Sequence, residues 1–296
     1  TKDLSFLDPK LQSFLATPAG QALLKFGHIR GDIGADEVAR GVMYSLRQQG
    51  LNPLFLAPRM GGRTLMDHNR PLAGASLFPV PSDVQEKLNE AYSLSMDTLF
   101  AYFTQYRDRI RVVYQPHTMG SGEFDEARVN AVTKKQNQLG LLADSDFEAY
   151  QRGVLELIDE WDGIYTDGCN HGPARADCDL VTGISQGKSP QGDNLPYQPI
   201  ADQGLAAAVR ARLLDLNING KFNDPFPHMT GYPGTRLAVS AAEAAIPQVT
   251  FDLAKRHLLQ DGKVFHASTF MPDTEKAMEI GVAIGSAARD VIENRT

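Results

Sequence analysis

The stretch RIRVVYQPHTMGSG (residues 109–122) decides where this chain builds its sheet and where one strand ends. Residues 112–114 are β-branched or aromatic, which predicts a buried strand. Pro116 has no amide hydrogen to give to a sheet, and the glycines that follow do not extend a strand. The pattern therefore places His117 at or just past the carboxyl end of a strand, where ligands and catalytic groups collect in open α/β sheets.

Strands and helices alternate along the chain on both sides of this stretch. Further strands are predicted at residues 22–27, 51–58, 180–183, 218–222 and 249–253. Helices are predicted at residues 35–50, 82–107, 204–214, 236–244 and 272–294, and residues 123–163 are predicted to be mostly helical. The strand, helix and strand in succession over residues 22–58 form a βαβ unit, which predicts a parallel sheet.

This order of elements predicts an α/β fold, a three-layer α/β/α arrangement with a mostly parallel central sheet. The chain has 296 residues, of which 42% are hydrophobic, so it can bury a substantial core. Neither an internal repeat nor a low-complexity linker divides it, and a single domain over residues 1–296 is expected.

Charge and hydropathy exclude two classes of partner. The net charge of −7 and the pI near 5.5 argue against a surface for nucleic acid or anionic lipid. No apolar run reaches the length of a membrane span. The expected partner is therefore a small molecule, and no feature of the sequence indicates an oligomeric state.

The two cysteines, Cys169 and Cys178, lie in a segment that contains glycine and proline. A local disulfide ranks first, free thiols second and a metal site with His171 last, because the spacing matches no zinc-ribbon pattern. Such a disulfide and the start at Thr1 together favour a periplasmic or secreted protein, with the cytoplasm as the alternative.

Histidines, carboxylates and arginines are expected together at one edge of the sheet. If the sheet is parallel, the turn after the first strand, the loop after the second, the third strand and the last strand all place polar groups there. These groups are His28 and Asp32, with Asp36 one turn further on, then Arg63, Asp67, His68, Asn69 and Arg70, then His117, and finally Asp252.

Such a set of residues suits zinc chemistry on a substrate that carries a carboxylate. Histidines and a carboxylate from separate loops, with one coordination position open, are what a catalytic zinc ion requires. Two arginines would bind a substrate carboxylate through their guanidinium forks. A further carboxylate would activate the water molecule bound to the metal ion.

The segment with Arg63, Asp67, Asn69, Arg70 and Pro71 resembles the Arg…Asp-x-Asn-Arg-Pro signature of the N-formylglutamate amidohydrolase family. This family belongs to the carboxypeptidase-like zinc hydrolases. Weaker similarities follow in the same order over most of residues 22–290. They are found at residues 32–38 (the acidic opening of the first helix), 116–118 (the family's Asp-x-His-Ser), 179–183 (a later strand), 223–226 with 231–232 (the substrate loop) and 249–253 (an Ile-Glu-Ile strand).

The resemblance implies a fold of the zinc exopeptidase type and a role for each candidate residue. His28, Asp32 and His117 would hold zinc, with Asp36 as the alternate ligand. Asp252 would act as the general base and His228 would contact the substrate or its oxyanion. The substrate would be bound by Arg63, Asn69 and Arg70.

Three features depart from the family pattern. The Pro-His-Ser-Gly motif of the family's first strand is not reproduced, which leaves the first metal ligand open. Asp252 stands where the family has Glu, and its side chain is one methylene shorter. Residues 140–178 resemble an insertion that would cover the site.

The expected function is a zinc-dependent amidohydrolase that cleaves an N-formyl or N-acyl amino acid or a small amide bearing a carboxylate. One alternative is a catalytically inactive binding protein of the same fold for acidic ligands. The other is a zinc carboxypeptidase that acts on longer peptides.

Overall fold

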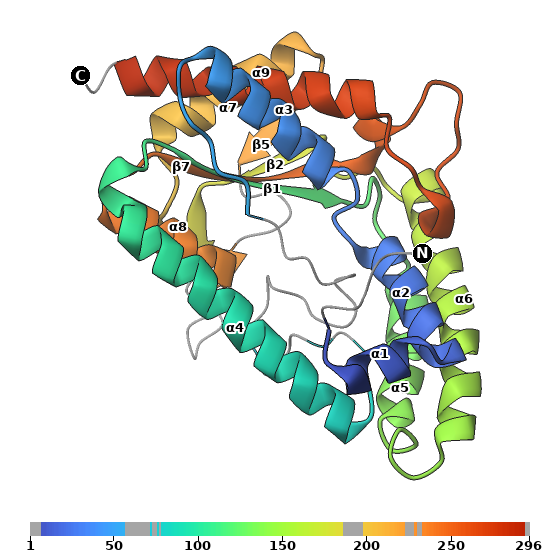
Figure 1. Cartoon of the computed structure of the whole chain (residues 1–296). Helices are drawn as coiled ribbons and strands as arrows, with labels where there is room; N and C mark the ends of the chain where they lie inside the picture. Colours follow the sequence, from blue (N-terminus) through green and yellow to red (C-terminus); the bar gives the residue numbers. More distant parts are fainter. Residues whose placement is uncertain are drawn as a thin grey trace, which may run out of the picture.

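The computed structural model describes residues 7–56, 72, 76, 78–185, 198–222, 228–229 and 233–293. Within these residues the chain is a mixed α/β protein with a four-stranded, mostly parallel sheet in the order β1-β7-β2-β5 (Figure 1). These strands are β1 (Val113–Met119), β7 (Gln248–Ala254), β2 (Cys178–Val181) and β5 (Gly220–Phe222). A smaller sheet has the order β4 (Gln198–Pro199), β3 (Gly183–Ser185) and β6 (His228–Met229).

Nine α-helices surround the strands in the described part of the chain. They are α1 (Pro9–Leu15), α2 (Pro18–Arg30), α3 (Ala35–Gln48), α4 (Ser82–Tyr106), α5 (Glu126–Leu139), α6 (Phe147–His171), α7 (Gln203–Asp215), α8 (Pro233–Glu243) and α9 (Thr274–Ile292). The helices predicted at residues 35–50, 82–107, 204–214, 236–244 and 272–294 are therefore confirmed, with small shifts at their ends.

The two faces of the four-stranded sheet differ in chemistry because side chains alternate along each strand. On β7, Val249, Phe251 and Leu253 point to one face and are fully buried. Figure 1 shows α3, α7 and α9 on one side of the sheet and α4 and α8 on the other. Tyr114 belongs to the apolar face and donates its hydroxyl hydrogen to the carbonyl of Ile284 in α9, at 3.4 Å.

We call the opposite side the polar face. The strand register places its residues in two neighbouring rows and one flanking position. The first row consists of His117, Asp252 and Asp179, and the second of Gln115, Thr250 and Val181. The flanking position is Gln248, which precedes Thr250 on β7 and is in register with Val113. Helix α8 packs against β7 and contributes the fully buried Ala238 and Ala241.

Helices α3 and α9 pack so closely that their contact needs glycine. A Cβ atom on Gly281 would lie 2.1 Å from the carbonyl oxygen of Val38, and one on Gly41 would lie 2.3 Å from that of Met278. The two backbones therefore approach closely at these positions, which leaves no room for a side chain there.

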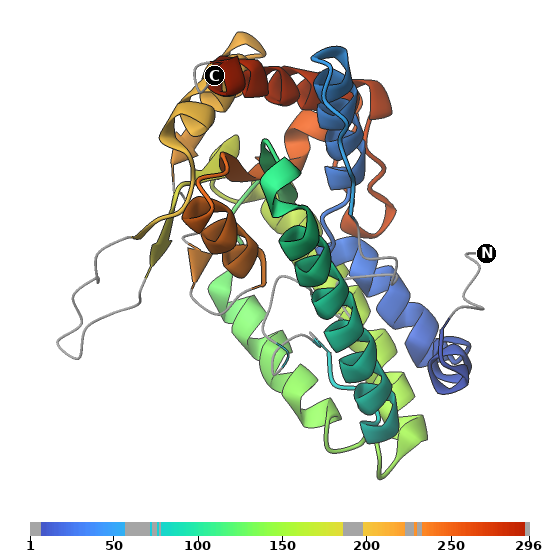
Figure 2. The same cartoon turned by 60° about the vertical axis from the view of Figure 1, so that its left-hand side comes forward.

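Residues 22–27 form part of helix α2, so the strand predicted there is wrong. Thr17 caps this helix by accepting a hydrogen bond from the amide of Gly20 at 3.1 Å, and Pro18 occupies the first helical position. Ala19, Leu23 and Phe26 then recur at helical spacing and are fully buried. Phe26 contacts Trp161 of α6, with ring centroids 5.9 Å apart, and Figures 1 and 2 show α2 and α6 side by side.

The strand predicted at residues 51–58 is also wrong over residues 51–56, because these have no regular secondary structure. Residues 57–58 are not among the residues that the structure describes. The side chains of Leu54 and Leu56 are exposed. Without these two strands the predicted βαβ unit does not form. The sheet is nevertheless mostly parallel, because β1 pairs with β7 and β2 with β5 in parallel.

Strand β1 continues past Pro116 to Met119, five residues beyond the predicted run at 112–114. Within the described sheet β1 has only β7 as a neighbour, and a proline is tolerated on an edge strand because no partner needs its missing hydrogen. His117 thus lies inside the strand, close to its carboxyl end.

Both cysteines are free thiols, so the first-ranked disulfide is wrong. Helix α6 extends to His171 and includes Cys169, whereas Cys178 begins β2 and is fully buried. Burial raises the pKa of the Cys178 thiol well above its ordinary value, and the carboxylates of Asp252, Asp179 and Asp177 add to this effect.

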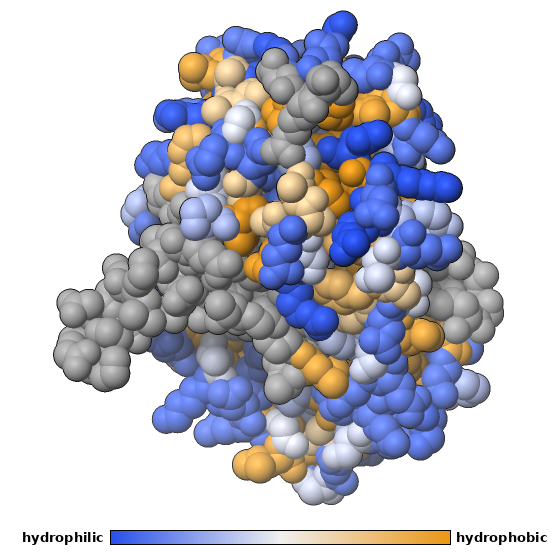
Figure 3. All heavy atoms as spheres, turned by 90° about the vertical axis from the view of Figure 1, so that its left-hand side faces the viewer, coloured by the Kyte–Doolittle hydropathy of each residue, from blue (hydrophilic) through white to orange (hydrophobic). Residues whose placement is uncertain are grey.

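The surface seen in Figure 3 carries small groups of hydrophobic side chains among hydrophilic ones. In the described part of the chain, no helix is both long and apolar enough to cross a bilayer.

Candidate functional site

His117 and Asp32 meet at the carboxyl end of β1. The Nδ1 atom of His117 lies 2.9 Å from the Oδ2 atom of Asp32. The two side chains are 18% and 20% exposed, so the pair is accessible to a small ligand while its charges are only partly screened by water. The predicted proximity of these two residues is confirmed by this distance.

The turn that carries Asp32 is fixed between two strands of the sheet. The hydroxyl of Thr118 on β1 donates to the carbonyl of Ile33 at 3.1 Å. The ammonium of Lys255, just past the end of β7, donates to the carbonyl of Gly31 at 2.8 Å. Gly34 allows the turn because its φ of 97° lies in the left-handed region that favours glycine.

Lys255 is an unusual member of this arrangement, since its side chain is only 4% exposed. A buried ammonium group is costly unless it is paired, and lysine is rarely found in such a position. Its ammonium group bonds to the carbonyl of Gly31, the residue before Asp32, and so brings a positive charge close to the His117–Asp32 pair.

Two more carboxylates lie beside His117 in the same row of the sheet. His117 is in register with Asp252 on β7, and Asp252 is in register with Asp179 on β2. Residues in register point to the same face, with Cβ atoms about 4.5–5.5 Å apart in an antiparallel pair. Asp179 is fully buried and Asp252 is half-buried.

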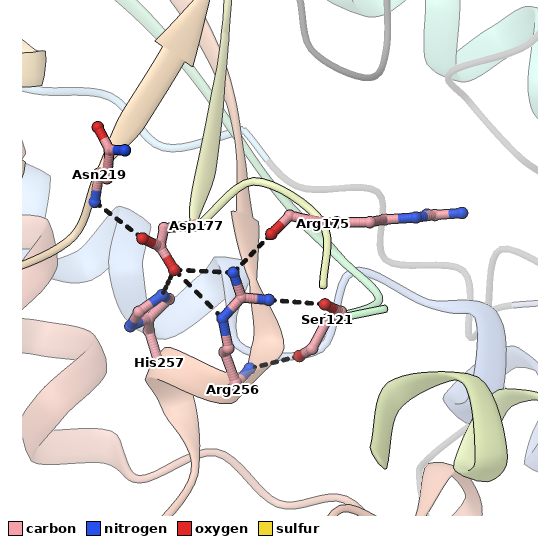
Figure 4. Close-up of polar contacts among 6 residues, drawn as sticks. All are labelled: Ser121, Arg175, Asp177, Asn219, Arg256 and His257. Atoms are coloured by element: carbon pink, nitrogen blue, oxygen red, sulfur yellow. Dashed lines mark hydrogen bonds and ion pairs between the residues drawn. The ribbon is translucent and has the colours of Figure 1, made fainter. Parts of the chain in front are cut away.

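A cluster around Arg256 joins the ends of the three strands that form this row (Figure 4). The guanidinium of Arg256 donates to Asp177 Oδ1 at 2.7 and 3.2 Å and to the carbonyls of Ser121 and Arg175 at 2.6 and 2.7 Å. Asp177 precedes β2, Ser121 follows β1 and Arg256 follows β7. The cluster therefore fixes the strand ends relative to one another, just beyond His117, Asp179 and Asp252.

Asp177 is the acceptor at the centre of this cluster. Its Oδ1 atom also lies 2.8 Å from Nε2 of His257, and its Oδ2 atom accepts the amide hydrogen of Asn219 at 3.1 Å. Burial by itself would raise the pKa of Asp177, but the hydrogen bonds from Arg256 and His257 outweigh it, and the pKa is lowered. Burial lowers the pKa of His257, and the charge of Arg256 acts in the same direction.

Three polar side chains on the polar face have atoms with no hydrogen-bond partner in the described structure. They are Gln115 Nε2, Thr250 Oγ1 and Gln248 Oε1, and only two other such atoms occur in the described residues, in Gln49 and Gln151. Gln115 is 9% exposed, and Gln248 and Thr250 are fully buried. Gln248 is held in place because its Nε2 atom donates to the carbonyl of Ile200 at 2.7 Å.

Several predicted site residues lie outside the description. Arg63, Asn69 and Arg70 belong to the undescribed residues 57–71. His28 lies in α2 and His228 in β6, but the structure describes only their backbones. Asp36, the alternate metal ligand, is exposed in the first turn of α3.

His257, which the sequence does not single out, is half-buried and bonded to Asp177. Sequence analysis also missed Lys255, Arg256 and the polar residues Gln115 and Thr250. Polar residues at alternate positions of a strand were a usable signal, because such a pattern predicts a polar face. Lys255 and Arg256, three and four residues after Asp252, belong to no sequence pattern that indicates their roles.

The pair of His117 and Asp32 has the donor atoms of a zinc site. Zinc binds histidine nitrogen and carboxylate oxygen at about 2.0–2.2 Å, so two tetrahedral ligands are about 3.3 Å apart. The observed 2.9 Å separation is that of a direct hydrogen bond and is somewhat shorter than this value. No group of three His, Cys, Asp or Glu side chains able to hold a metal ion occurs among the described residues.

Comparisons with family models, with curated proteins and with solved structures find no match to this chain.

Proposed function

We propose that this protein is a zinc-dependent amidohydrolase that cleaves the amide bond of an N-formyl or N-acyl amino acid or a similar small amide with a carboxylate. The observation that carries this proposal is the 2.9 Å contact of His117 with Asp32 beside Asp252 in the same row. The resemblance of residues 63–71 to the N-formylglutamate amidohydrolase signature supports it, and with it a three-layer fold of the zinc exopeptidase type.

Each residue has a distinct part in this proposal. His117 and Asp32 would hold zinc, with His28 as the third ligand. Bound zinc would polarise the amide carbonyl and acidify a water molecule. Asp252 would accept the proton of the attacking water and deliver it to the leaving amine.

The remaining residues orient the substrate. Arg63 and Arg70, assisted by Asn69, would bind its carboxylate, and His228 would contact the developing oxyanion. Lys255 and Thr118 would keep the Asp32 turn against the strand ends, which preserves the geometry on which the reaction depends.

Zinc content and amide hydrolysis, measured on matched variants, test the proposal. The purified protein is expected to hold about one zinc per chain and to lose hydrolysis of N-formyl or N-acetyl amino acids when treated with a chelator. His117→Asn and Asp32→Asn should each reduce kcat/KM at least about 100-fold, because each removes a ligand. Asp97→Asn, which changes an exposed carboxylate in helix α4, should leave both measurements unchanged.

A protein without zinc, or full activity in His117→Asn, would refute the proposal. Binding of acidic ligands without hydrolysis would instead support the inactive binding protein, an alternative motivated by the lack of a third ligand among the described residues. Preference for longer peptides in the same substrate panel would support a carboxypeptidase.

A further inference from the structure

The unpaired polar atoms of Gln115, Thr250 and Gln248 lie together on the polar face, next to the row of His117 and Asp252. A buried polar atom without a partner costs free energy, so such atoms are rare and call for an explanation. Here three of them share one face of one sheet.

The positions of these atoms follow from the strand register. Gln115 is in register with Thr250, and Gln248 lies two residues before Thr250 on the same strand. Two residues along a strand span about 6.6 Å, so Gln115 and Thr250 lie about that far from His117 and Asp252. The side chain of a small ligand whose amide bond lies at His117 would reach this distance.

We propose that Gln115, Thr250 and Gln248 form a subsite that binds a neutral carboxamide group of the substrate. This inference rests on the proposed function, because it specifies which N-acyl amino acids the same site accepts. The substrates would be derivatives of glutamine or a similar amide-bearing residue.

The chemistry of the three atoms selects a carboxamide. Gln115 Nε2 is a donor, Gln248 Oε1 is an acceptor and the Thr250 hydroxyl is both. The carbonyl oxygen of a carboxamide can accept a hydrogen bond from Gln115 Nε2, and its NH₂ group can donate one to Gln248 Oε1. The bond from Gln248 Nε2 to Ile200 keeps the Oε1 atom as the free end of that side chain.

A carboxylate fits this subsite less well for two reasons. It has no hydrogen to give to Gln248 Oε1, and it would place a negative charge near Asp252 and Asp179. An apolar side chain would leave all three protein atoms unpaired. Val181 completes the row of Gln115 and Thr250 and gives an apolar wall for the methylene groups of a ligand.

Binding of three matched probes tests this inference. N-acetyl-L-glutamine, N-acetyl-L-glutamate and N-acetyl-L-norleucine differ at the end of the side chain, and their affinities are measured by calorimetry with a chelator present to prevent turnover. The glutamine derivative is expected to bind at least about tenfold more tightly than the other two. Gln115→Met and Thr250→Val should abolish this preference by weakening the binding of the glutamine derivative.

A second measurement separates a binding role from a structural one. Thr250→Val should keep or raise the melting temperature, because it removes a hydroxyl that has no partner in the free protein. A lowered melting temperature would show that the hydroxyl is already bonded and would overturn the inference. Gln151→Met removes a side chain on α6, outside the sheet, whose Oε1 atom has no partner, and should leave the preference among the probes intact.

Equal affinity for the three probes, or no binding of N-acetyl-L-glutamine, would also overturn the inference. These results are independent of the zinc assay. A carboxamide preference in a protein that lacks zinc would refute the proposed hydrolysis and support the subsite, whereas hydrolysis without this preference would do the reverse.

Discussion

His117 and Asp32 are separated by 85 positions in the chain, yet their side-chain atoms Nδ1 and Oδ2 lie 2.9 Å apart. Strand β1 supplies the histidine, and the turn between α2 and α3 supplies the aspartate. Because that turn is bonded to both β1 and the end of β7, the contact depends on the packing of the sheet as well as on the two residues themselves.

Lys255→Met is expected to loosen this turn. The substitution keeps most of the buried stem of the side chain but leaves the Gly31 carbonyl without the ammonium donor, which should lower the free energy of unfolding by about 1–3 kcal/mol. Urea denaturation at pH 7 measures this change. Lys263→Met, at an exposed lysine, should stay within about 0.5 kcal/mol of the unmodified protein, and an equally small effect for Lys255→Met would contradict the role assigned to it.

Arg256→Met is expected to destabilise the protein by about 2–3 kcal/mol. The change removes charge-assisted hydrogen bonds to Asp177 and bonds to two carbonyls at the strand ends. Arg128→Met is the matched control, since its ion pair with Asp167 is about half exposed on each side and should contribute less than about 1 kcal/mol. Similar decreases in the free energy of unfolding for the two variants would show that the Arg256 cluster does not hold the strand ends.

The free energy of unfolding should decrease from pH 7.5 to pH 5.5, in part because His257 takes up a proton. Its pKa is lowered from 6.5 by burial and by the charges of Arg256 and Lys276, against the opposing effect of Asp177. The unfolded chain therefore takes up a proton at this residue more readily than the folded chain. The resulting stability is present above about pH 6.5 and is lost as the pH falls toward the folded pKa.

His257→Gln tests this dependence, because it keeps a polar side chain that does not titrate. Denaturation curves at several pH values should show a smaller loss for the variant than for the unmodified protein over this range. The contribution of Asp177 lies lower, since its pKa is reduced below 3.8 and its effect is lost only in stronger acid. An unchanged slope in the variant would contradict the assignment to His257.

Gly281→Ala should destabilise the contact between α3 and α9 by about 1–3 kcal/mol or more, because its methyl group would overlap the Val38 carbonyl. Gly163→Ala is a control within helix α6, where the nearest atom to an added Cβ is 3.6 Å away. This second change should stabilise the protein by about 0.5–1 kcal/mol, as alanine is the better helix former. Thermal unfolding of both variants would test the opposite signs, and a stabilised Gly281→Ala would refute the close packing.

The sequence predicted the long-range features of the site better than the local structure of the first 60 residues. The apolar pattern predicted the strand at residues 249–253 and several of the helices, and the strand-end argument placed His117 beside Asp252. The same argument placed Asp32 near His117 by way of a strand at residues 22–27, where the structure has a helix instead. Thr17 and Pro18 form a capping threonine followed by proline, which is a helix start, and so residues 22–27 continue a helix and not the predicted strand.

Other features of the site depend on contacts that sequence spacing does not encode. The burial of Lys255 follows from the path of the Asp32 turn, which only the folded structure reveals. The roles of Arg63, Asn69, Arg70 and His228 remain predictions, because their side chains lie outside the described residues.

The packing of α9 has a consequence for synthesis on the ribosome. Helix α9 follows Val249, Phe251 and Leu253 in the chain, so the part of the sheet face that α9 covers stays exposed until residues 274–292 have left the exit tunnel. During this time the partly made chain presents a surface to which chaperones bind and through which chains aggregate. The yield of native protein is therefore expected to depend on how quickly translation passes through residues 274–292.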